Sequence, residues 1–107
     1  MERRVVVTGV GLITPVGLTT DVTWSSLLEG RSGVGPITKF DASDYAVAIA
    51  GEVSDLNATD FVSKKDLKKM DLHIVYALAA TADAWAMASV AGAYEADRIG
   101  TIIGSGI

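Results

Sequence analysis

The chain has 107 residues, 50% of them hydrophobic, and a formal net charge of -4 from 9 basic and 13 acidic side chains. This size and apolar content fit one small folded domain and argue against disorder, and the net negative charge argues against general nucleic-acid binding. Because the sequence has no cysteine, it has no disulfide framework, no thiolate zinc site and no thiol nucleophile, and it suits a reducing cytoplasm.

The first predicted element is a strand at residues 5–8, which read Val-Val-Val-Thr. A run without polar alternation is typical of a strand that is covered on both faces in a parallel or mixed sheet. The run breaks at Gly9 and Gly11 and continues through Thr14-Pro15-Val16-Gly17. Three valines are too few for the apolar core of a secretory signal peptide, so no signal peptide is predicted.

A helix is predicted next. Thr20 can cap a helix that begins near Asp21, and Gly30 supplies its C-terminal stop. Its plausible inward positions are the apolar residues Val22, Leu27 and Leu28.

Residues 31–46 contain glycines, a proline and several short polar residues, and they predict a loop. Residues 47–53 predict a short strand that is interrupted at Gly51. Ser63, followed three residues later by Asp66, is a capping-box-like start for a further helix.

That helix is expected to break near Met70 and Asp71, and its second part runs from residue 72 to about residue 91. The second part has an apolar surface wider than a single stripe, which predicts burial nearly all round, as between two layers of sheet. It is also the one stretch to test as a membrane span, but His73, Asp83 and a high alanine content favour a buried soluble helix.

Residues 98–103, which read Arg-Ile-Gly-Thr-Ile-Ile, predict a second buried strand that runs into a glycine-rich turn. Helices between two such strands are typical of an α/β fold, in which chemistry gathers at the rim of the sheet. A helix buried all round needs more partners than 107 residues easily supply. The pattern therefore predicts an α/β fold that is incompletely covered within this sequence.

Two glycine motifs suggest functions that their spacing does not support. Gly9-Val-Gly11 resembles the start of a dinucleotide-binding fingerprint, but Thr14 stands at the third glycine position and no helix opens at once, which favours a structural role. Gly104-Ser105-Gly106 lacks the glycines two residues either side of the serine that a nucleophile elbow needs. Ser105 is therefore interpreted as a small residue that allows tight backbone packing.

His73 is the only histidine, so neither a histidine-based metal site nor a two-histidine catalytic set can be built from this sequence alone. The carboxylates are scattered, and no spacing among them indicates an acid–base pair. No metal and no cofactor are predicted.

Four lysines form the clearest functional candidate: Lys64, Lys65, Lys68 and Lys69. They make two i, i+4 pairs near a predicted helix N-terminus, where like charges and the positive end of the helix dipole are both locally unfavourable. Helix stability therefore does not account for them. Three interpretations stay open: an ordinary solvated face, a landing site for an anionic partner, or a nucleic-acid footprint, which lacks interleaved aromatic residues here.

Six segments agree, in order, with one known family: Arg3-Arg-Val-Val-Val-Thr-Gly-Val-Gly-Leu-Ile-Thr-Pro-Val-Gly17, Trp24-Ser-Ser-Leu-Leu-Glu-Gly-Arg-Ser-Gly33, Phe40-Asp41, Ala50-Gly51, Lys68-Lys-Met-Asp71 and Arg98-Ile-Gly-Thr-Ile-Ile-Gly-Ser-Gly106. Together they resemble the N-terminal part of the elongating β-ketoacyl-acyl carrier protein synthases of type II fatty acid synthesis. Proteins of that family are several times longer. The resemblance therefore implies a piece of a larger protein, whose nucleophilic cysteine and two catalytic histidines lie beyond Ile107.

The resemblance implies a thiolase-like layered α-β-α-β-α fold, of which residues 1–107 form an incomplete part of the first half without an internal domain boundary. For the complete enzyme it implies decarboxylative Claisen condensation of acyl and malonyl thioesters by a cytoplasmic homodimer without a cofactor or metal. No catalytic residue falls in this segment. Lys65, Lys68 and Lys69, with Lys64 adjoining, match positions at which the family receives its acidic acyl carrier protein, and Ile107 matches a residue that lines the acyl pocket.

Two further interpretations stay open. One is a non-catalytic, chain-length-factor-like ketosynthase subunit, which keeps the fold but lacks the nucleophile. The other is a small α/β interaction module that folds alone. Neither nucleic acid nor a membrane is an expected partner in any of these cases.

Overall fold

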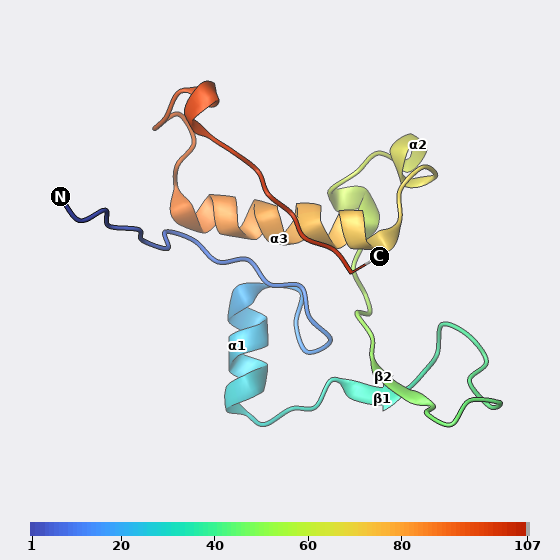
Figure 1. Cartoon of the computed structure of the whole chain (residues 1–107). Helices are drawn as coiled ribbons and strands as arrows, with labels where there is room; N and C mark the ends of the chain where they lie inside the picture. The colour runs from blue at the N-terminus through green and yellow to red at the C-terminus, as the bar shows by residue number, and fades with distance from the viewer. Residues whose placement is uncertain (107) are drawn as a thin grey trace. The chain divides into compact units, whose positions relative to one another are not determined.

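The computed structural model describes residues 1–106 of the chain (Figure 1). In chain order, its elements are α1 (Thr20–Leu28), β1 (Val34–Pro36), β2 (Ile49–Gly51), the 3-10 turn η1 (Ala58–Asp60), α2 (Lys64–Leu67), α3 (Leu72–Ala88) and the 3-10 turn η2 (Ala96–Arg98). They fall into two compact units. One unit is Leu12–Asn57, and the other combines Met1–Gly11 with the described residues from Ala58 onward.

The first of these units contains α1 and a two-stranded antiparallel sheet. β1 and β2 pair in the register Val34 with Gly51, Gly35 with Ala50 and Pro36 with Ile49. β2 lies within the predicted strand 47–53, which is confirmed, whereas β1 lies inside the segment predicted as loop. A three-residue strand that contains glycine and proline carries little strand signal, and proline is tolerated because this small sheet has only edges.

The ends of α1 lie close to their predicted positions. Thr19, one residue before the predicted cap, is the N-cap, and its hydroxyl accepts a 3.3 Å hydrogen bond from the backbone N–H of Val22. Gly30 has the positive φ of 68° that a helix-terminating glycine supplies, as predicted.

The predicted inward face of α1 is wrong. The residues that the helix buries are Thr23 and Ser26, which are 3% and 4% exposed, whereas Val22, Leu27 and Leu28 are all exposed. The reason is hydrogen bonding, because both buried hydroxyls donate to carbonyl oxygens of the turn at residues 14–17. The apolar pattern alone does not contain this information.

In the other unit, the N-terminal segment lies on α3 through its glycines. A Cβ atom added to Gly11 would fall on the carbonyl oxygen of Ala80 and 2.9 Å from the backbone nitrogen of Ala84. A Cβ added to Gly9 would fall on the carbonyl oxygen of Ala84 and 2.9 Å from the backbone nitrogen of Ala88. Only glycine permits this approach, which confirms a structural role for the two glycines, although the contact is made along a helix and not in a turn.

The two predicted buried strands of this unit are wrong for the described residues. Residues 5–8 and 99–103 have no regular secondary structure, and residue 98 ends η2. Within residues 1–106 neither segment pairs with a neighbouring strand, and a strand exists only through hydrogen bonds to a partner.

The predicted start of α2 and the break before α3 are confirmed. The Ser63 hydroxyl accepts a hydrogen bond from the backbone N–H of Asp66 and donates one of 2.7 Å to its carboxylate. The chain then breaks at Met70 and Asp71, and Asp71 is the N-cap of α3. α3 ends at Ala88, three residues before the predicted limit, where Ser89 adopts a left-handed conformation.

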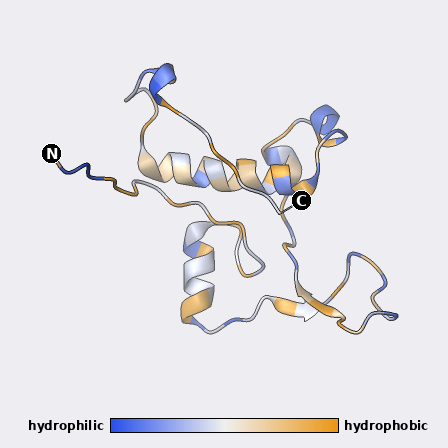
Figure 2. Cartoon of the chain, in the orientation of Figure 1, coloured by the Kyte–Doolittle hydropathy of each residue, from blue (hydrophilic) through white to orange (hydrophobic). Residues whose placement is uncertain are grey.

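Burial of α3 nearly all round does not occur within the described residues. Val75 and Ala79 are buried, but Leu72, Leu78 and Met87 are exposed, and Figure 2 shows apolar colour along most of the helix. The solvent-accessible surface area of the chain is 8714 Å². Two separate compact proteins, each of half this mass, would together have a solvent-accessible area of about 6,800 Å². Much apolar surface is therefore uncovered. No helix in residues 1–106 is long and apolar enough to cross a membrane.

Candidate functional site

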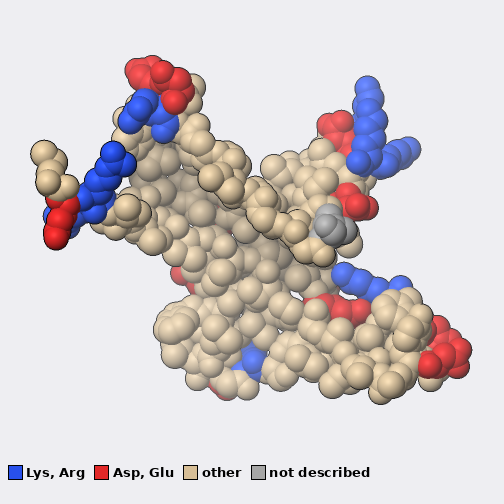
Figure 3. Space-filling model, in the orientation of Figure 1, with Lys and Arg blue, Asp and Glu red and all other residues tan. Residues whose placement is uncertain are grey.

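The four predicted lysines form one exposed group, here called the lysine surface: Lys64, Lys65, Lys68 and Lys69. Lys64 and Lys65 are the first residues of α2, Lys68 is its C-cap, and Lys69 lies in the turn that follows. Figure 3 shows basic side chains gathered over this part of the chain. The capped one-turn helix thus presents four cations from six consecutive positions.

The lysine surface differs from the prediction in its relation to the helix dipole. α2 has only four residues, so a sizeable macrodipole does not develop, and Lys68 and Lys69 follow the helix end at which cations are favourable. Repulsion among four close like charges remains. The one carboxylate within the group belongs to Asp66, and it accepts the hydrogen bond from Ser63.

Nothing in the described part of the chain neutralises these lysines. The ion pair found in residues 1–106 lies elsewhere, between Arg31 and Glu29, whose side chains approach to 2.8 Å. Four unpaired cations on a chain of net charge -4 make a local positive surface on an acidic protein. Such a surface can steer an anionic partner toward one place on the molecule.

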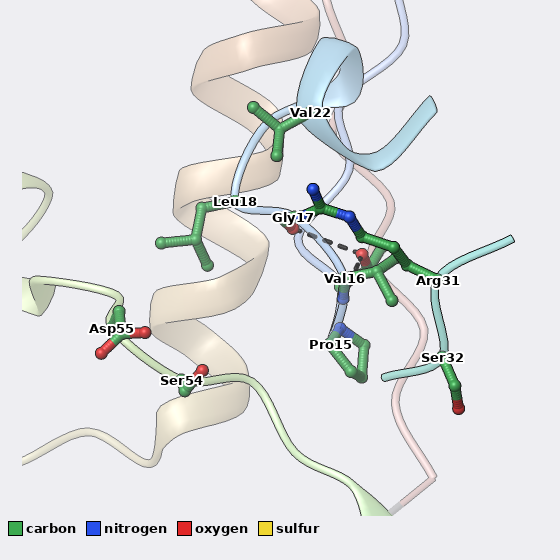
Figure 4. A pocket seen from close by; sticks show the side chains of 10 residues that line it. Pro15, Val16, Gly17, Leu18, Val22, Arg31, Ser32, Ser54 and Asp55 are labelled. Carbon is green, nitrogen blue, oxygen red and sulfur yellow. Dashed lines mark hydrogen bonds between the residues drawn. The ribbon is translucent and has the colours of Figure 1, made fainter. Parts of the chain in front are cut away.

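A hollow of about 350 Å³ lies beside the turn at residues 14–17, within the unit that contains α1. Figure 4 shows Arg31 and Ser32 on one side of it, and Ser54 and Asp55 on the other. Asp55 has a positive φ of 63°, a conformation that aspartate adopts more readily than most residues.

The polar atoms of this turn are already engaged within the fold. Thr14 and Gly17 exchange two backbone hydrogen bonds of 2.8 and 3.2 Å. The Thr23 hydroxyl donates to the Gly17 carbonyl at 3.3 Å, and the Ser26 hydroxyl donates to the Val16 carbonyl at 2.8 Å. A Cβ on Gly17 would lie 2.7 Å from the Thr23 hydroxyl. These hydrogen bonds hold the turn against α1. The hydroxyls of Thr23 and Ser26 therefore have a structural role.

A second hollow, of about 480 Å³, is lined by His73 and Ser105, which lie far apart in the sequence. Its other lining residues are mostly small or aliphatic: Gly11, Ala77, Ala80, Thr81, Ala84, Ile102, Ile103 and Gly104. Within residues 1–106 no hydrogen bond joins His73 to Ser105, so the two do not form an activated nucleophile pair.

The tight packing predicted for Gly104-Ser105-Gly106 is not present in the described residues. Cβ atoms added at Gly104 and Gly106 would meet nothing within 4 Å. Ile107, the predicted acyl-pocket residue, lies outside the described residues. Within residues 1–106 no three histidine, cysteine, aspartate or glutamate side chains are placed to hold a metal ion.

Two exposed carboxylates have lowered pKa values. Hydrogen bonds from Ser43 lower the pKa of Asp41, and the Thr38 hydroxyl, which donates to the carboxylate at 2.8 Å, lowers the pKa of Glu52. Glu52 also accepts 3.2 Å bonds from the backbone N–H groups of Thr38 and Lys39. Both carboxylates thereby secure loops that flank the small sheet, and neither has an environment typical of a general acid.

Comparison with known proteins gives a consistent picture. The family described as "Beta-ketoacyl synthase, N-terminal domain" matches residues 2–107. A protein of Synechocystis sp. named "3-oxoacyl-[acyl-carrier-protein] synthase 2" is 49% identical to the chain, and one of the same name from Vibrio harveyi is 47% identical. Each comparison covers 99% of this chain and 26% of the relative. The chain thus spans about a quarter of the length of these relatives.

Among solved structures, "The ishigamide ketosynthase/chain length factor" is similar to this chain with a TM-score of 0.73 and 36% sequence identity. The similarity covers 83% of this chain and 22% of that one. The chain is therefore an incomplete α/β segment of the thiolase-like fold that ketosynthases share, as predicted.

Proposed function

Because the chain belongs to the β-ketoacyl synthase family, we propose that it is the N-terminal segment of a 3-oxoacyl-acyl carrier protein synthase that elongates fatty acyl chains. The observation that carries this proposal is the match of residues 2–107 to the family's N-terminal domain, together with 49% and 47% identity to two synthases of that name. The complete protein is then an acyltransferase, and we propose that it acts as a cytoplasmic homodimer.

The proposed reaction joins two thioesters. An acyl group moves from its carrier to a cysteine thiolate, and malonyl-carrier then loses CO2 to form a carbanion that attacks the acyl thioester carbon. The carbon–carbon bond forms, and the enzyme thiolate leaves as the β-ketoacyl-carrier is released. Two histidines and an oxyanion hole stabilise the negative charge that develops. Residues 1–107 contain no cysteine and one histidine, so the nucleophile and at least one of the two histidines belong to another part of the protein in this proposal. The family resemblance implies that both histidines lie there.

In this proposal the lysine surface receives the acyl carrier protein, which is acidic. Four exposed cations within six positions, without an ion-pair partner in the described chain, support this role. The names of the relatives also specify a substrate bound to the carrier protein. The proposal further assigns Ile107 to the acyl pocket.

The proposal is tested with the complete protein that carries this segment. The purified protein should convert acyl-carrier and malonyl-carrier into β-ketoacyl-carrier and CO2, and mass spectrometry detects the condensed product. Residues 1–107 alone should give none, because they contain no thiol. A complete protein that forms no product with any acyl chain length, or product formed by residues 1–107 alone, would contradict the proposal.

A second candidate function is a non-catalytic subunit of the chain-length-factor kind. It is favoured by the solved structure whose printed name joins a ketosynthase with a chain length factor. The two candidates differ at one position, because a chain-length factor lacks the nucleophilic cysteine. Incubation of the complete protein with an acyl-carrier separates them: a synthase retains a covalent acyl group that hydroxylamine releases, and a chain-length factor retains none.

A further inference from the structure

The side-chain amines of the lysine surface are accessible to small reactive molecules. All four lysines are exposed, and within residues 1–106 none of their ammonium groups has an ion-pair partner. Lysine becomes a nucleophile when its ammonium group loses a proton, and it is the residue that acetylation modifies. An amine held in an ion pair must leave its partner before it reacts. The lysine surface therefore meets the first requirement of an acylation site, which is access.

The second requirement is a reason for an acyl donor to gather at this place. Removing the four positive charges of the lysine surface from the net charge of -4 leaves -8, so the rest of the chain is strongly acidic. A donor that carries phosphate groups is repelled by such a protein as a whole and attracted to its lysine surface. Acyl phosphates and coenzyme A thioesters both join a reactive acyl group to phosphate. The lysine surface thus favours donors of this chemical class.

The fifth lysine of the chain, Lys39, has different surroundings. It is exposed, as the lysine surface is, but its backbone N–H donates a 3.2 Å hydrogen bond to the carboxylate of Glu52, and its charge interacts with that carboxylate. A phosphate-bearing donor gains less from a lysine beside a negative charge. Lys39 therefore separates the effect of local charge on acylation from the effect of exposure.

We propose that the lysine surface is a site of Nε-acylation by donors that carry phosphate groups. The neutral amine attacks the acyl carbon of the donor, and a carbon–nitrogen bond forms. The carbon–sulfur bond of a coenzyme A thioester, or the carbon–oxygen bond of an acyl phosphate, breaks. The thiolate or the phosphate leaves with the electron pair, and the amine passes its proton to water.

Each acylation replaces an ammonium group by a neutral amide and so removes one positive charge. The first acylation thereby lowers the attraction for the next donor, which makes the modification self-limiting. The consequence for activity rests on the proposed function: the same loss of charge should weaken association with the acidic carrier protein. Acylation of the lysine surface then slows condensation when activated acyl groups accumulate.

Mass spectrometry of the complete protein tests the proposal. The protein is incubated with acetyl-CoA, with acetyl phosphate or with the neutral thioester S-acetyl-N-acetylcysteamine, and neutral hydroxylamine then removes acyl groups from thiols and leaves amides. Cleavage before aspartate places the lysine surface in peptides 60–65 and 66–70, and Lys39 in peptide 21–40. With a phosphate-bearing donor at low salt, we expect acylation per lysine to be about fivefold higher at the lysine surface than at Lys39.

Two controls isolate the electrostatic cause. High salt should reduce the excess over Lys39 to about twofold or less, because screening shortens the reach of exposed charges. The neutral thioester should give an excess of about twofold or less at any salt concentration, because it has no phosphate for the lysines to attract.

A pair of charge-reversal variants tests the same cause within the protein. Lys65→Glu combined with Lys69→Glu should lower acylation of the two remaining lysines about fivefold at low salt. Arg3→Glu with Arg4→Glu makes the same change of charge away from α2, and it should leave that acylation within about twofold of wild type.

The results have distinct meanings. An excess with one of the two phosphate-bearing donors supports the proposal and identifies the donor. Equal acylation per lysine at Lys39 and at the lysine surface would overturn it, because exposure alone would then govern the reaction. An equal excess with the neutral thioester, or equal effects of the two charge-reversal variants, would overturn it as well.

The consequence for activity has its own readout. Protein acetylated and cleared with hydroxylamine is compared with its own untreated sample, and its kcat/KM for carrier-bound substrate should fall about fivefold, whereas that for a small acyl thioester should not change. A variant with arginine in place of all four lysines keeps the charge but has no amine to acylate at this place. Treatment should not alter its kcat/KM for carrier-bound substrate, and a loss as large as that of wild type would overturn the role in activity.

The outcome is separable from that of the proposed function. Acylation is measured by mass and needs no condensation, and condensation is assayed on untreated protein. An active synthase that is acylated equally at Lys39 and at the lysine surface disproves only the acylation site. A protein that is acylated selectively at the lysine surface but forms no β-ketoacyl product disproves only the proposed function.

Discussion

α3 and α1 are held in their units by different kinds of contact. α3 is fitted by shape: Gly9 and Gly11 lie directly on its backbone, at Ala80 and Ala84. α1 is fitted by hydrogen bonds, from Thr23 and Ser26 to the carbonyl groups of a turn. Both helices leave large apolar side chains exposed. The comparison shows that the neighbouring segment determines which face of a helix is buried. In α1 the buried face is polar, because the neighbouring turn offers carbonyl groups.

The shape-fitted contact should be the most sensitive to substitution. Gly11→Ala places a methyl group on the Ala80 carbonyl, and because both sides of the contact are backbone, neither moves easily. We expect a loss of about 3 kcal/mol in the free energy of unfolding of the complete protein, measured by denaturant titration. Gly35→Ala is the control, since its added methyl meets nothing within 4 Å. Equal losses at both glycines would mean that the α3 contact is not fitted by shape.

The hydrogen-bonded contact of α1 should be the next most sensitive. Ser26→Ala removes the 2.8 Å bond to the Val16 carbonyl and leaves a part-buried acceptor without that partner. The expected loss in the free energy of unfolding is about 1–2 kcal/mol. Ser25→Ala, on the exposed side of the same helix, should stay within about 0.5 kcal/mol. If Ser26→Ala lowered the free energy of unfolding no more than Ser25→Ala does, then packing, and not hydrogen bonding, would hold α1.

The small sheet of the same unit should respond to pH through Glu52. Hydrogen bonds from Thr38 and Lys39 lower its folded-state pKa below the ordinary value of 4.5. The carboxylate's stabilising contribution is therefore fully present above pH 4.5 and is lost as the pH falls through the folded-state pKa. We expect the backbone amides of Thr38 and Lys39 to lose protection from hydrogen exchange over that acidic range.

Glu52→Gln should remove this acid-dependent loss of protection, because glutamine does not titrate. Glu95→Gln, at an exposed position outside the sheet, is the control and should leave the exchange profile of Thr38 and Lys39 unchanged. A pH response that survives in Glu52→Gln would assign the titration to another group.

Substitutions in the lysine surface should have the smallest effect on stability, because these side chains lack the close contacts that hold α1 and α3. Lys65→Glu combined with Lys69→Glu should change the free energy of unfolding by about 0.5 kcal/mol or less. In the complete protein it should lower kcat/KM for carrier-bound substrate roughly tenfold at low salt, since rim charges act mainly on association. A small acyl thioester without the carrier should react as before.

Salt provides an internal check on this prediction. The wild-type advantage should shrink as ionic strength rises, because screening shortens the reach of exposed charges to about 8 Å at physiological salt. Arg3→Glu with Arg4→Glu makes the same change of charge at exposed positions away from α2 and is the matched control. Equal losses with both substrates, or an equal effect of the control pair, would leave the lysine surface as an ordinary solvated face.

The sequence by itself determined the features that depend on neighbours within a few residues. The Ser63 cap, the break at Met70 and Asp71, and the helix stop at Gly30 were all predicted, because each arises from hydrogen bonds or φ preferences inside one turn of chain. The exposure of the four lysines followed from their charge. The family followed from ordered agreement along nearly the whole chain, which depends on no single contact.

The tertiary structure alone decided the features that need a distant partner. A strand exists only where another strand accepts its hydrogen bonds, so residues 5–8 stay irregular in spite of their three valines, while Val34–Pro36 pairs in spite of its glycine and proline. The rotation of α1 depends on the carbonyls of Val16 and Gly17, which no helical periodicity encodes. Hydrogen-bond partners outside each element thus decided pairing and rotation, because local apolar patterns carry no information about where those partners lie.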